Sequence, residues 1–212
     1  MPFVFSDNNT FCISLLSKPD RWERMKKRFD VLSMKVTRWA ASTSAIDKFG
    51  DRLRPGEIGC AQSHVNIWRY MVQQNLEYAL IFEDDACLDK DWVNKLALLK
   101  LPEEWDLVLL NACDPIEPRD TWVPVTEQYL TAGYILSLKG AQRLLHDFAH
   151  CFYSSDWMTT RLQNYGQSYS YFPWLCIQEN AESCIGNAVD ANRKKVVDSL
   201  AKINYDLANY VE

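Results

Sequence analysis

The 212-residue sequence lacks the short signatures that identify several large enzyme classes. It has seven cysteines but no Cys-x-x-Cys pair, and it has neither a glycine-rich phosphate loop nor the glycine fingerprint of dinucleotide-binding proteins. An odd number of scattered cysteines argues against a disulfide framework and against a zinc site. We therefore expect free thiols, and the missing glycine patterns argue against kinases and dehydrogenases.

Clustered positive charge and long apolar runs are also missing. The net charge is -5, which argues against a nucleic-acid partner because phosphate backbones attract clustered Lys and Arg. No apolar run approaches the roughly 20 residues that a membrane-spanning helix needs, and no signal-peptide pattern opens the chain. We expect no nucleic-acid partner, no membrane span and a cytoplasmic location, which would be the host cytoplasm for a viral protein.

The stretch with the clearest chemistry is an apolar run that ends in three carboxylates. Residues 78–82 show no polar alternation, which is typical of a strand buried on both faces of a helix-covered sheet. Glu83, Asp84 and Asp85 follow, and ligands of such sheets gather at the carboxyl ends of the strands. A Mg²⁺ or Mn²⁺ ion that bridges to a diphosphate would relieve their mutual repulsion. The alternative is a polar turn in which Asp84 or Asp85 caps a helix.

Strands alternate with helices through the first half of the chain, which predicts an α/β domain with a central, mostly parallel sheet. The length fits a single domain over residues 1–212, which could be the first domain of a longer protein. Residues 122–129 and 131–137 are expected to pair as neighbouring strands. The other expected strands are 10–16, 36–40, 105–111 and 168–175, and the expected helices are 20–32, 56–75, 91–99, 139–150, 157–165 and 190–210.

The order of these segments resembles family 25 of the glycosyltransferases, which includes bacterial lipooligosaccharide galactosyltransferases and collagen galactosyltransferases. The similarity covers roughly residues 10 to 187, and two of its motifs are specific only in combination. These are residues 53–64 (LRPGEIGCAQSH) and 81–86 (IFEDDA), accompanied by 13–16 with 20–25 and by 131–137 with 139–145. Weaker similarities fall at Asp156, Pro173, Gln178 and Ser183.

The resemblance implies a GT-A fold, which is a nucleotide-binding three-layer α/β sandwich. It also implies transfer of a hexose such as galactose or glucose from a UDP-sugar to a glycan or another hydroxylated acceptor, with Mn²⁺ or Mg²⁺ as the cofactor. Asp85 would hold the metal with help from Glu83 or Asp84, and Glu83 would also reach the ribose or sugar of the donor. The metal would neutralise the charge that the leaving diphosphate gains.

Four further residues are candidates for the site, and each has a simpler reading. Arg21 could pair with the donor, or it could be a solvated residue at the start of a helix. Ser63 and His64, in the first motif, could contact the cofactor, although a helical His is commonly a packing residue. Asp156 is the candidate base for an inverting transfer, and otherwise a helix cap.

Two other functions stay open from the sequence. The family usually carries an Asp near Ser183 and Ile185, where this chain has Cys184. This departure leaves room for a non-catalytic module that binds nucleotide or glycan. A metal-dependent phosphohydrolase could also use carboxylates at a strand end. A transferase would consume UDP-sugar quickly only when an acceptor is present, which separates the three functions.

Overall fold

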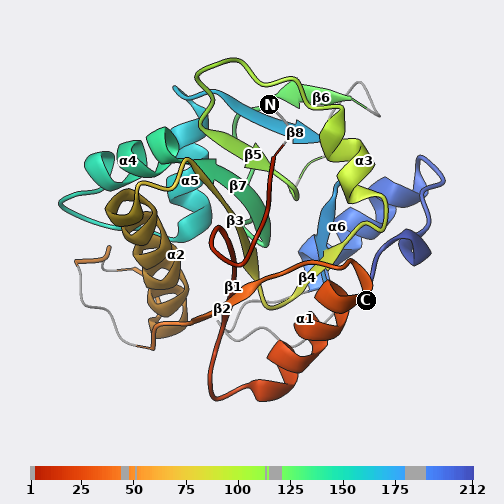
Figure 1. Cartoon of the computed structure of the whole chain (residues 1–212), viewed down its shortest axis with the longest axis horizontal. Coiled ribbons are helices and arrows are strands. Elements are labelled where there is room, and N and C mark those ends of the chain that lie inside the picture. Colours follow the sequence, from red (N-terminus) through yellow and green to blue (C-terminus); the bar gives the residue numbers. More distant parts are fainter. Residues whose placement is uncertain (1–2, 44–47, 51, 113, 115–120, 180–189) are drawn as a thin grey trace.

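A computed structural model describes residues 3–43, 48–50, 52–112, 114, 121–179 and 190–212 (Figure 1). The helices in these ranges are α1 (Pro19–Val31), α2 (Pro55–Gln74), α3 (Trp92–Ala97), α4 (Leu138–Asp147), α5 (Ser155–Gln163) and α6 (Asp190–Ala201), followed by a 3₁₀ turn at Leu207–Asn209. The strands are β1 (Thr10–Ser14), β2 (Thr37–Ala40), β3 (Tyr78–Glu83), β4 (Ala86–Leu88), β5 (Leu107–Leu109), β6 (Trp122–Pro124), β7 (Gly133–Ser137), β8 (Ser168–Tyr171) and β9 (Cys176–Gln178).

The main sheet has seven strands in the order β2-β1-β3-β7-β5-β8-β6. The neighbours β1·β2, β1·β3 and β5·β8 pair in parallel, whereas β7 is antiparallel to both β3 and β5 and β6 is antiparallel to β8. Five of the seven strands therefore run in one direction, with β6 and β7 reversed. This arrangement confirms the expected α/β class with a central, mostly parallel sheet.

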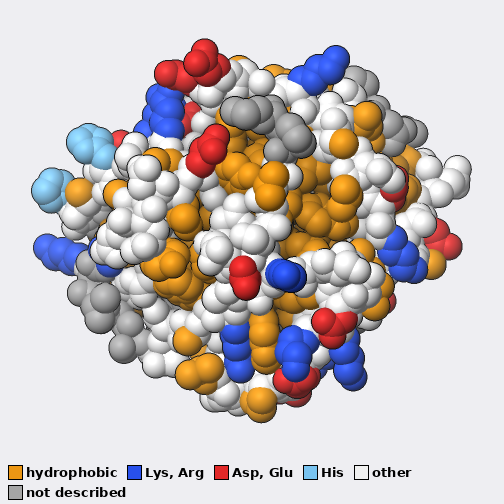
Figure 2. Space-filling view, viewed as in Figure 1, with side chains coloured by type: hydrophobic (Ala, Val, Ile, Leu, Met, Phe, Trp, Pro, Cys, Tyr) orange, Lys and Arg blue, Asp and Glu red, His pale blue; other side chains and the backbone are white. Residues whose placement is uncertain are grey.

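The sheet is covered on both faces, which produces three layers. The side chains that alternate along β3 show this division. Ala79 and Ile81 pack in the core that α2, α4 and α5 complete, and Leu80 and Phe82 pack in the core with α1 and α3. A third apolar cluster joins α6 to β9 and the segment before it. The same view as a surface shows apolar side chains around the middle of this face and most charges near its edge (Figure 2).

The acidic stretch follows directly from the strand order. β3 lies near the middle of the sheet, and its last residue, Glu83, is aligned with Ile13 of β1. The chain then turns into β4, which pairs with β9 in a small antiparallel sheet. Ala86 faces Gln178 in that pairing, so the turn that contains Asp84 and Asp85 lies between the main sheet and the small one.

The first motif forms the start of α2, and its residues explain that start. Pro55 occupies the first turn, where its missing N–H costs nothing, and Glu57 accepts a hydrogen bond from the Arg54 N–H at 2.7 Å. A Cβ atom at Gly59 would lie 2.6 Å from the carbonyl oxygen of Ser42. Only glycine allows this close approach between α2 and the segment that follows β2.

Some expectations about the second half of the chain are wrong. Residues 122–129 and 131–137 do not form a hairpin, because β7 lies between β3 and β5 while β6 pairs with β8. The last helix ends at Ala201 rather than near residue 210. The sequence reading also missed β4 and β9 as paired strands.

The expected free thiols are confirmed for the cysteines that lie in the described ranges, which are Cys12, Cys60, Cys87, Cys151 and Cys176. None of the helices described for this chain is both long enough and apolar enough to cross a bilayer. Ser183 and Cys184 lie outside the described residues.

Candidate active site

Arg21 and Asp84 form the best-buried ion pair at the end of β3. Arg21 Nε donates to Asp84 Oδ1 at 2.7 Å, and the Arg21 Nη2 atom lies 2.6 Å from the same oxygen. Both side chains are nearly buried, with exposed fractions of 9% and 12%. Arg21 is therefore not a solvated residue at a helix start. Two nitrogens on one carboxylate oxygen hold Asp84 firmly and link α1 to the acidic turn.

Asp85 is in a very different state from its neighbour. Its Oδ2 atom lies 3.7 Å from Arg21 Nη2 and 3.4 Å from Gln178 Nε2, so both contacts are long. Its Oδ1 atom is buried and has no hydrogen-bond partner among the described residues. Burial and the negative charge of Glu83 raise the pKa of Asp85 to about 7, and Arg21 only partly opposes them. A carboxylate oxygen in this situation is a fitting ligand for a cation.

Glu83 is held by two donors from other parts of the chain. His64 Nε2 lies 3.2 Å from Glu83 Oε1, and Thr131 Oγ1 donates to the same oxygen at 2.7 Å. Burial acts to raise the pKa of Glu83, but the hydrogen bonds from His64 and Thr131 and the charge of Arg21 outweigh it. The pKa of Glu83 therefore lies below its usual value, and the residue is ionised at neutral pH.

The tautomer of His64 follows from a buried network behind Glu83. Trp68 Nε1, which can only donate, donates to the hydroxyl of Tyr134 at 3.0 Å. The same hydroxyl lies 2.8 Å from His64 Nδ1. Because the ionised Glu83 carboxylate can only accept, His64 Nε2 carries the proton of their hydrogen bond, which leaves Nδ1 of a neutral ring to accept from the Tyr134 hydroxyl. His64 is fully buried, so it orients Glu83 from behind rather than facing a ligand.

A second chain of hydrogen bonds connects Glu83 to the start of α5. The hydroxyls of Thr131 and Ser155 lie 3.0 Å apart, and Asp156 is the next residue. Within the described residues, the Asp156 carboxylate accepts a single hydrogen bond, a local one from the Trp157 N–H at 2.8 Å. Its charge acts on Cys60 together with those of Glu83 and Asp85, which places it within electrostatic reach of them.

Ser63 does not join this group. Its hydroxyl donates to the Gly59 carbonyl at 2.7 Å and accepts from the Ser42 N–H at 2.9 Å. These contacts tie α2 to the segment after β2, at the close approach that Gly59 permits. The structure thus brings Arg21, Asp84 and Asp85 together and joins Glu83 to His64. Ser63 instead has a structural role, because it links α2 to the segment after β2.

Within the described residues, a group of three side chains and the single carboxylate of Asp85 are the candidates for holding a metal ion. Cys60, His64 and Glu83 offer ligand atoms within 4.8 Å of one another. Burial, assisted by the charge of Glu83, raises the pKa of the Cys60 thiol well above its usual range, and a hard cation prefers oxygen ligands to a thiol. His64 and Glu83 already satisfy each other. Asp85, with its unpaired oxygen, fits a hard cation better.

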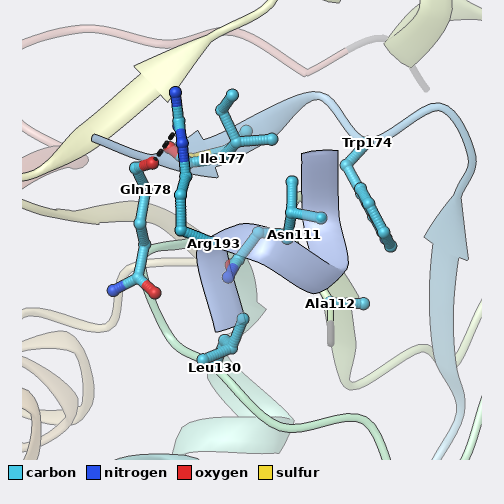
Figure 3. Close-up of a pocket in the computed structure, with 9 residues that line it drawn as sticks. Asn111, Ala112, Leu130, Trp174, Ile177, Gln178 and Arg193 are labelled. Carbon is cyan, nitrogen blue, oxygen red and sulfur yellow. Dashed lines mark hydrogen bonds between the residues drawn. The ribbon is translucent and has the colours of Figure 1, made fainter. Parts of the chain in front are cut away.

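A small hollow, partly open to solvent, lies beside the acidic turn. Asn111, which follows β5 closely, Gln178 at the end of β9, and Arg193 of α6 line it (Figure 3). Gln178 connects it to the acidic turn through the 3.4 Å contact with Asp85. Asn111 and Arg193 were not predicted, because no local pattern marks a residue whose partner lies on a distant element.

The sequence reading also missed the arginines that follow Arg21 on α1. Arg28 is buried and pairs with Glu179, and it donates to the Ala86 carbonyl at 3.1 Å. Arg24 pairs with the other oxygen of Glu179 at 2.9 Å. The spacing of these arginines at positions 21, 24 and 28 places them on one helix face, which was the available signal.

Comparison with known proteins gives the family. The sequence profile described as "Glycosyltransferase family 25 (LPS biosynthesis protein)" matches residues 7–115, just over half of the chain. The chain belongs to glycosyltransferase family 25. The matched residues include Arg21, Ser63, His64 and the acidic triplet, whereas Asp156 lies beyond them.

Several relatives support this assignment over a longer part of the chain. A glycosyltransferase 25 family member of Drosophila melanogaster is 32% identical over 165 residues, which is 64% of this chain and 27% of that protein. Procollagen galactosyltransferase 1-B of Xenopus laevis is 29% identical over 180 residues, 69% of this chain and 29% of that protein. The human protein named inactive glycosyltransferase 25 family member 3 is 30% identical over 175 residues, with coverages of 68% and 29%.

This family 25 chain thus spans less than a third of the length of these relatives. Among solved structures, a glycosyltransferase involved in the glycosylation of the major capsid of PBCV-1 aligns with a TM-score of 0.40 and 5% identity, over 89% of this chain and 96% of that one.

Proposed function

We propose that this family 25 chain transfers a hexose from a UDP-sugar to a hydroxyl of a glycan or another hydroxylated acceptor, with the help of a divalent metal ion. The observation that carries the proposal is Asp85, whose buried Oδ1 atom has no partner in the described part of the chain. Family membership supplies the reaction class, and the carboxylate at the end of β3 supplies a reason for a cation.

Asp85 would hold the metal ion, with Glu83 close by on the same strand end. When bound, a divalent ion such as Mn²⁺ or Mg²⁺ neutralises charge on the diphosphate of the leaving group. Arg21 adds a fixed positive charge on the same side, although Asp84 already takes two of its hydrogen-bond donors. Glu83, ionised and oriented by His64, would accept hydrogen bonds from hydroxyls of the donor.

The transfer itself requires that an acceptor hydroxyl lose its proton. The oxygen of that hydroxyl forms a bond to the anomeric carbon of the hexose while the bond from that carbon to the diphosphate breaks and UDP leaves. Asp156 would take the proton in an inverting reaction, since it lies in the first turn of α5 and its carboxylate is only partly buried. Ser155, bonded to Thr131, fixes this turn relative to Glu83.

The test is the thermal melting of the protein with UDP and UDP-hexoses, with and without Mn²⁺, for the wild type and for Asp85→Asn. A ligand that binds only the folded protein raises the melting temperature. We expect a rise with UDP that requires Mn²⁺ and that is lost in Asp85→Asn. Asp30→Asn, which removes an exposed carboxylate on α1, should behave like the wild type. No shift of the wild type with any of these ligands would overturn the proposal.

Turnover separates this function from the two alternatives. A transferase consumes UDP-hexose rapidly only with an acceptor, a phosphohydrolase consumes it without one, and a binding module consumes it in neither case. The human relative whose name calls it inactive gives a specific reason to measure turnover as well as binding.

A further inference from the structure

The connection between β6 and β7 is attached to α5 through the main chain of Gln128. The Gln128 N–H donates to Gln163 Oε1 at 2.9 Å, and the Gln128 carbonyl accepts from Thr160 Oγ1 and from Gln163 Nε2, each at 2.7 Å. Thr160 and Gln163 are buried side chains in the second half of α5. Because both polar groups of this peptide unit are paired with buried partners, the connection is held in one position at Gln128.

The same connection ends at the acidic strand end. The Thr131 hydroxyl donates to Glu83 at 2.7 Å and lies 3.0 Å from the Ser155 hydroxyl. Gln128 therefore lies beside the second half of α5 and Thr131 beside its first residue, so the chain between them runs antiparallel to the helix. This course places the two residues between them beside the turn that contains Asp156.

The backbone of the connection is strained on both sides of its free segment. Glu127 and Leu130 have φ angles of 58° and 83°, in the left-handed region that a residue as bulky as leucine rarely adopts. Such conformations cost free energy, and they gather at ligand sites, where the surrounding structure enforces them. Leu130 lines the hollow beside the acidic turn (Figure 3). The strain therefore lies at the rim of the candidate site.

Tyr129, which precedes Leu130, is the side chain that this segment presents to solvent. It is 42% exposed, and within the described residues its ring packs on no other aromatic ring and its hydroxyl makes no hydrogen bond. Trp157 is also exposed near Asp156, but its ring packs against Tyr153, with centroids 4.4 Å apart, and the Arg161 guanidinium lies 5.6 Å from its centroid. The ring of Tyr129 is thus the one open to a ligand.

We infer that Tyr129 binds the acceptor, with its ring stacked on a sugar ring whose reacting hydroxyl meets Asp156. The inference rests on the proposed function and deepens it, because it selects a glycan rather than a hydroxylated side chain as the acceptor. A pyranose ring has a flat face of C–H groups that can cover an aromatic ring, whereas a short hydroxylated side chain offers little area for such packing.

The experiment measures initial rates of UDP release from UDP-galactose and UDP-glucose with Mn²⁺. The acceptor probes are the methyl glycosides of glucose, galactose and mannose, and a peptide rich in serine and threonine. Tyr129→Ala removes the ring, and Tyr129→Phe keeps the ring and removes only the hydroxyl. We expect Tyr129→Ala to lower kcat/KM for the best glycoside roughly tenfold and Tyr129→Phe to stay within about twofold of the wild type. Affinity for UDP-hexose, measured by calorimetry, should stay unchanged in both.

Tyr165→Ala is the matched control, because Tyr165 is 53% exposed but follows α5 at the end opposite Asp156. It should leave kcat/KM and donor affinity unchanged, and both alanine variants should melt close to the wild type.

Three results would overturn the inference while the proposed function stands. Tyr129→Ala could leave kcat/KM unchanged or weaken UDP-hexose binding to the same extent, Tyr129→Phe could lose as much as Tyr129→Ala, or a wild type that binds UDP with Mn²⁺ could use none of the glycosides. If the wild type does not bind UDP or UDP-hexose at all, the proposed function fails and this inference fails with it.

Discussion

Glu83 and Asp85 lie two residues apart at the end of β3, yet their carboxyl groups differ in state. Despite burial, the pKa of Glu83 is held below its usual value by hydrogen bonds from His64 and Thr131, whereas burial and the charge of Glu83 raise the pKa of Asp85 to about 7. Pairs of carboxyls whose environments separate their pKa values commonly have different roles. Here one is a fixed anion and the other is open to a cation.

The raised pKa of Asp85 predicts how stability depends on pH when metal is removed. Between the unfolded value near 3.8 and about 7, the folded state holds a proton that the unfolded state has lost. The contribution of Asp85 to the free energy of unfolding therefore falls as pH rises through this window. We expect Asp85→Asn to gain stability relative to the wild type between pH 4 and pH 8, as urea unfolding in EDTA would measure.

A bound cation reverses that trend, because it competes with the proton on Asp85. With Mn²⁺ added, the wild type should be stabilised more at pH 8 than at pH 5, and Asp85→Asn should show no such gain. An equal response of the two proteins to Mn²⁺ at both pH values would remove Asp85 from the metal site.

The hydrogen-bond network behind His64 predicts that removing one oxygen atom, the hydroxyl of Tyr134, lowers the free energy of unfolding. Tyr134→Phe removes the acceptor of the Trp68 N–H and the partner of His64 Nδ1, and leaves both buried without those bonds. We expect a loss of about 1–3 kcal/mol in the free energy of unfolding. The control is Tyr129→Phe, since Tyr129 is 42% exposed and should change stability little.

The affinity of Tyr134→Phe for UDP-hexose gives a second readout of the same network. If His64 orients Glu83 for the donor, affinity for UDP-hexose should fall together with stability. A variant that is destabilised but binds the donor normally would show that the network serves only the core.

How far the sequence predicts this molecule depends on whether a feature is local. The buried strand β3 was predicted because an uninterrupted apolar run followed by carboxylates is a local pattern, and the start of α2 was predicted from its local sequence. The position of β7 between β3 and β5 was not predicted, because pairing between strands far apart in the chain leaves no periodic signal. Residues 122–129 and 131–137 were therefore expected to pair as neighbours.

The same distinction holds for the site. The motifs indicated Arg21, His64 and the three carboxylates, with Arg21 expected to pair with the donor, but they did not indicate that Arg21 pairs with Asp84. That depends on the turn after β3, which directs Asp84 toward α1 and leaves Asp85 with only long contacts. Asn111 and Tyr134 depend on neighbours on other elements, so only the fold reveals them.

Arg24 and Arg28 of α1 pair with the same carboxylate but differ in burial. We expect burial, rather than charge alone, to determine how much each ion pair adds to the free energy of unfolding. Arg28 is 3% exposed and bonds both Glu179 and the Ala86 carbonyl, so Arg28→Met leaves a largely buried carboxylate with one partner fewer. We expect a loss of about 3 kcal/mol in the free energy of unfolding. Arg24→Met, at a side chain 41% exposed that pairs with the same carboxylate, should cost about 1 kcal/mol or less. Equal costs in urea unfolding would contradict this reasoning.

The last prediction concerns Asp156, the candidate base. Asp156→Asn keeps an oxygen for the Trp157 N–H but cannot take a proton at neutral pH, so kcat for transfer should fall by roughly 10²- to 10⁴-fold. Affinity for UDP-hexose, measured by calorimetry, should stay the same, because the change affects only the acceptor hydroxyl. Asp30→Asn should leave both quantities unchanged. A normal kcat in Asp156→Asn would show that Asp156 only begins α5, and that the base lies elsewhere or that the reaction retains configuration.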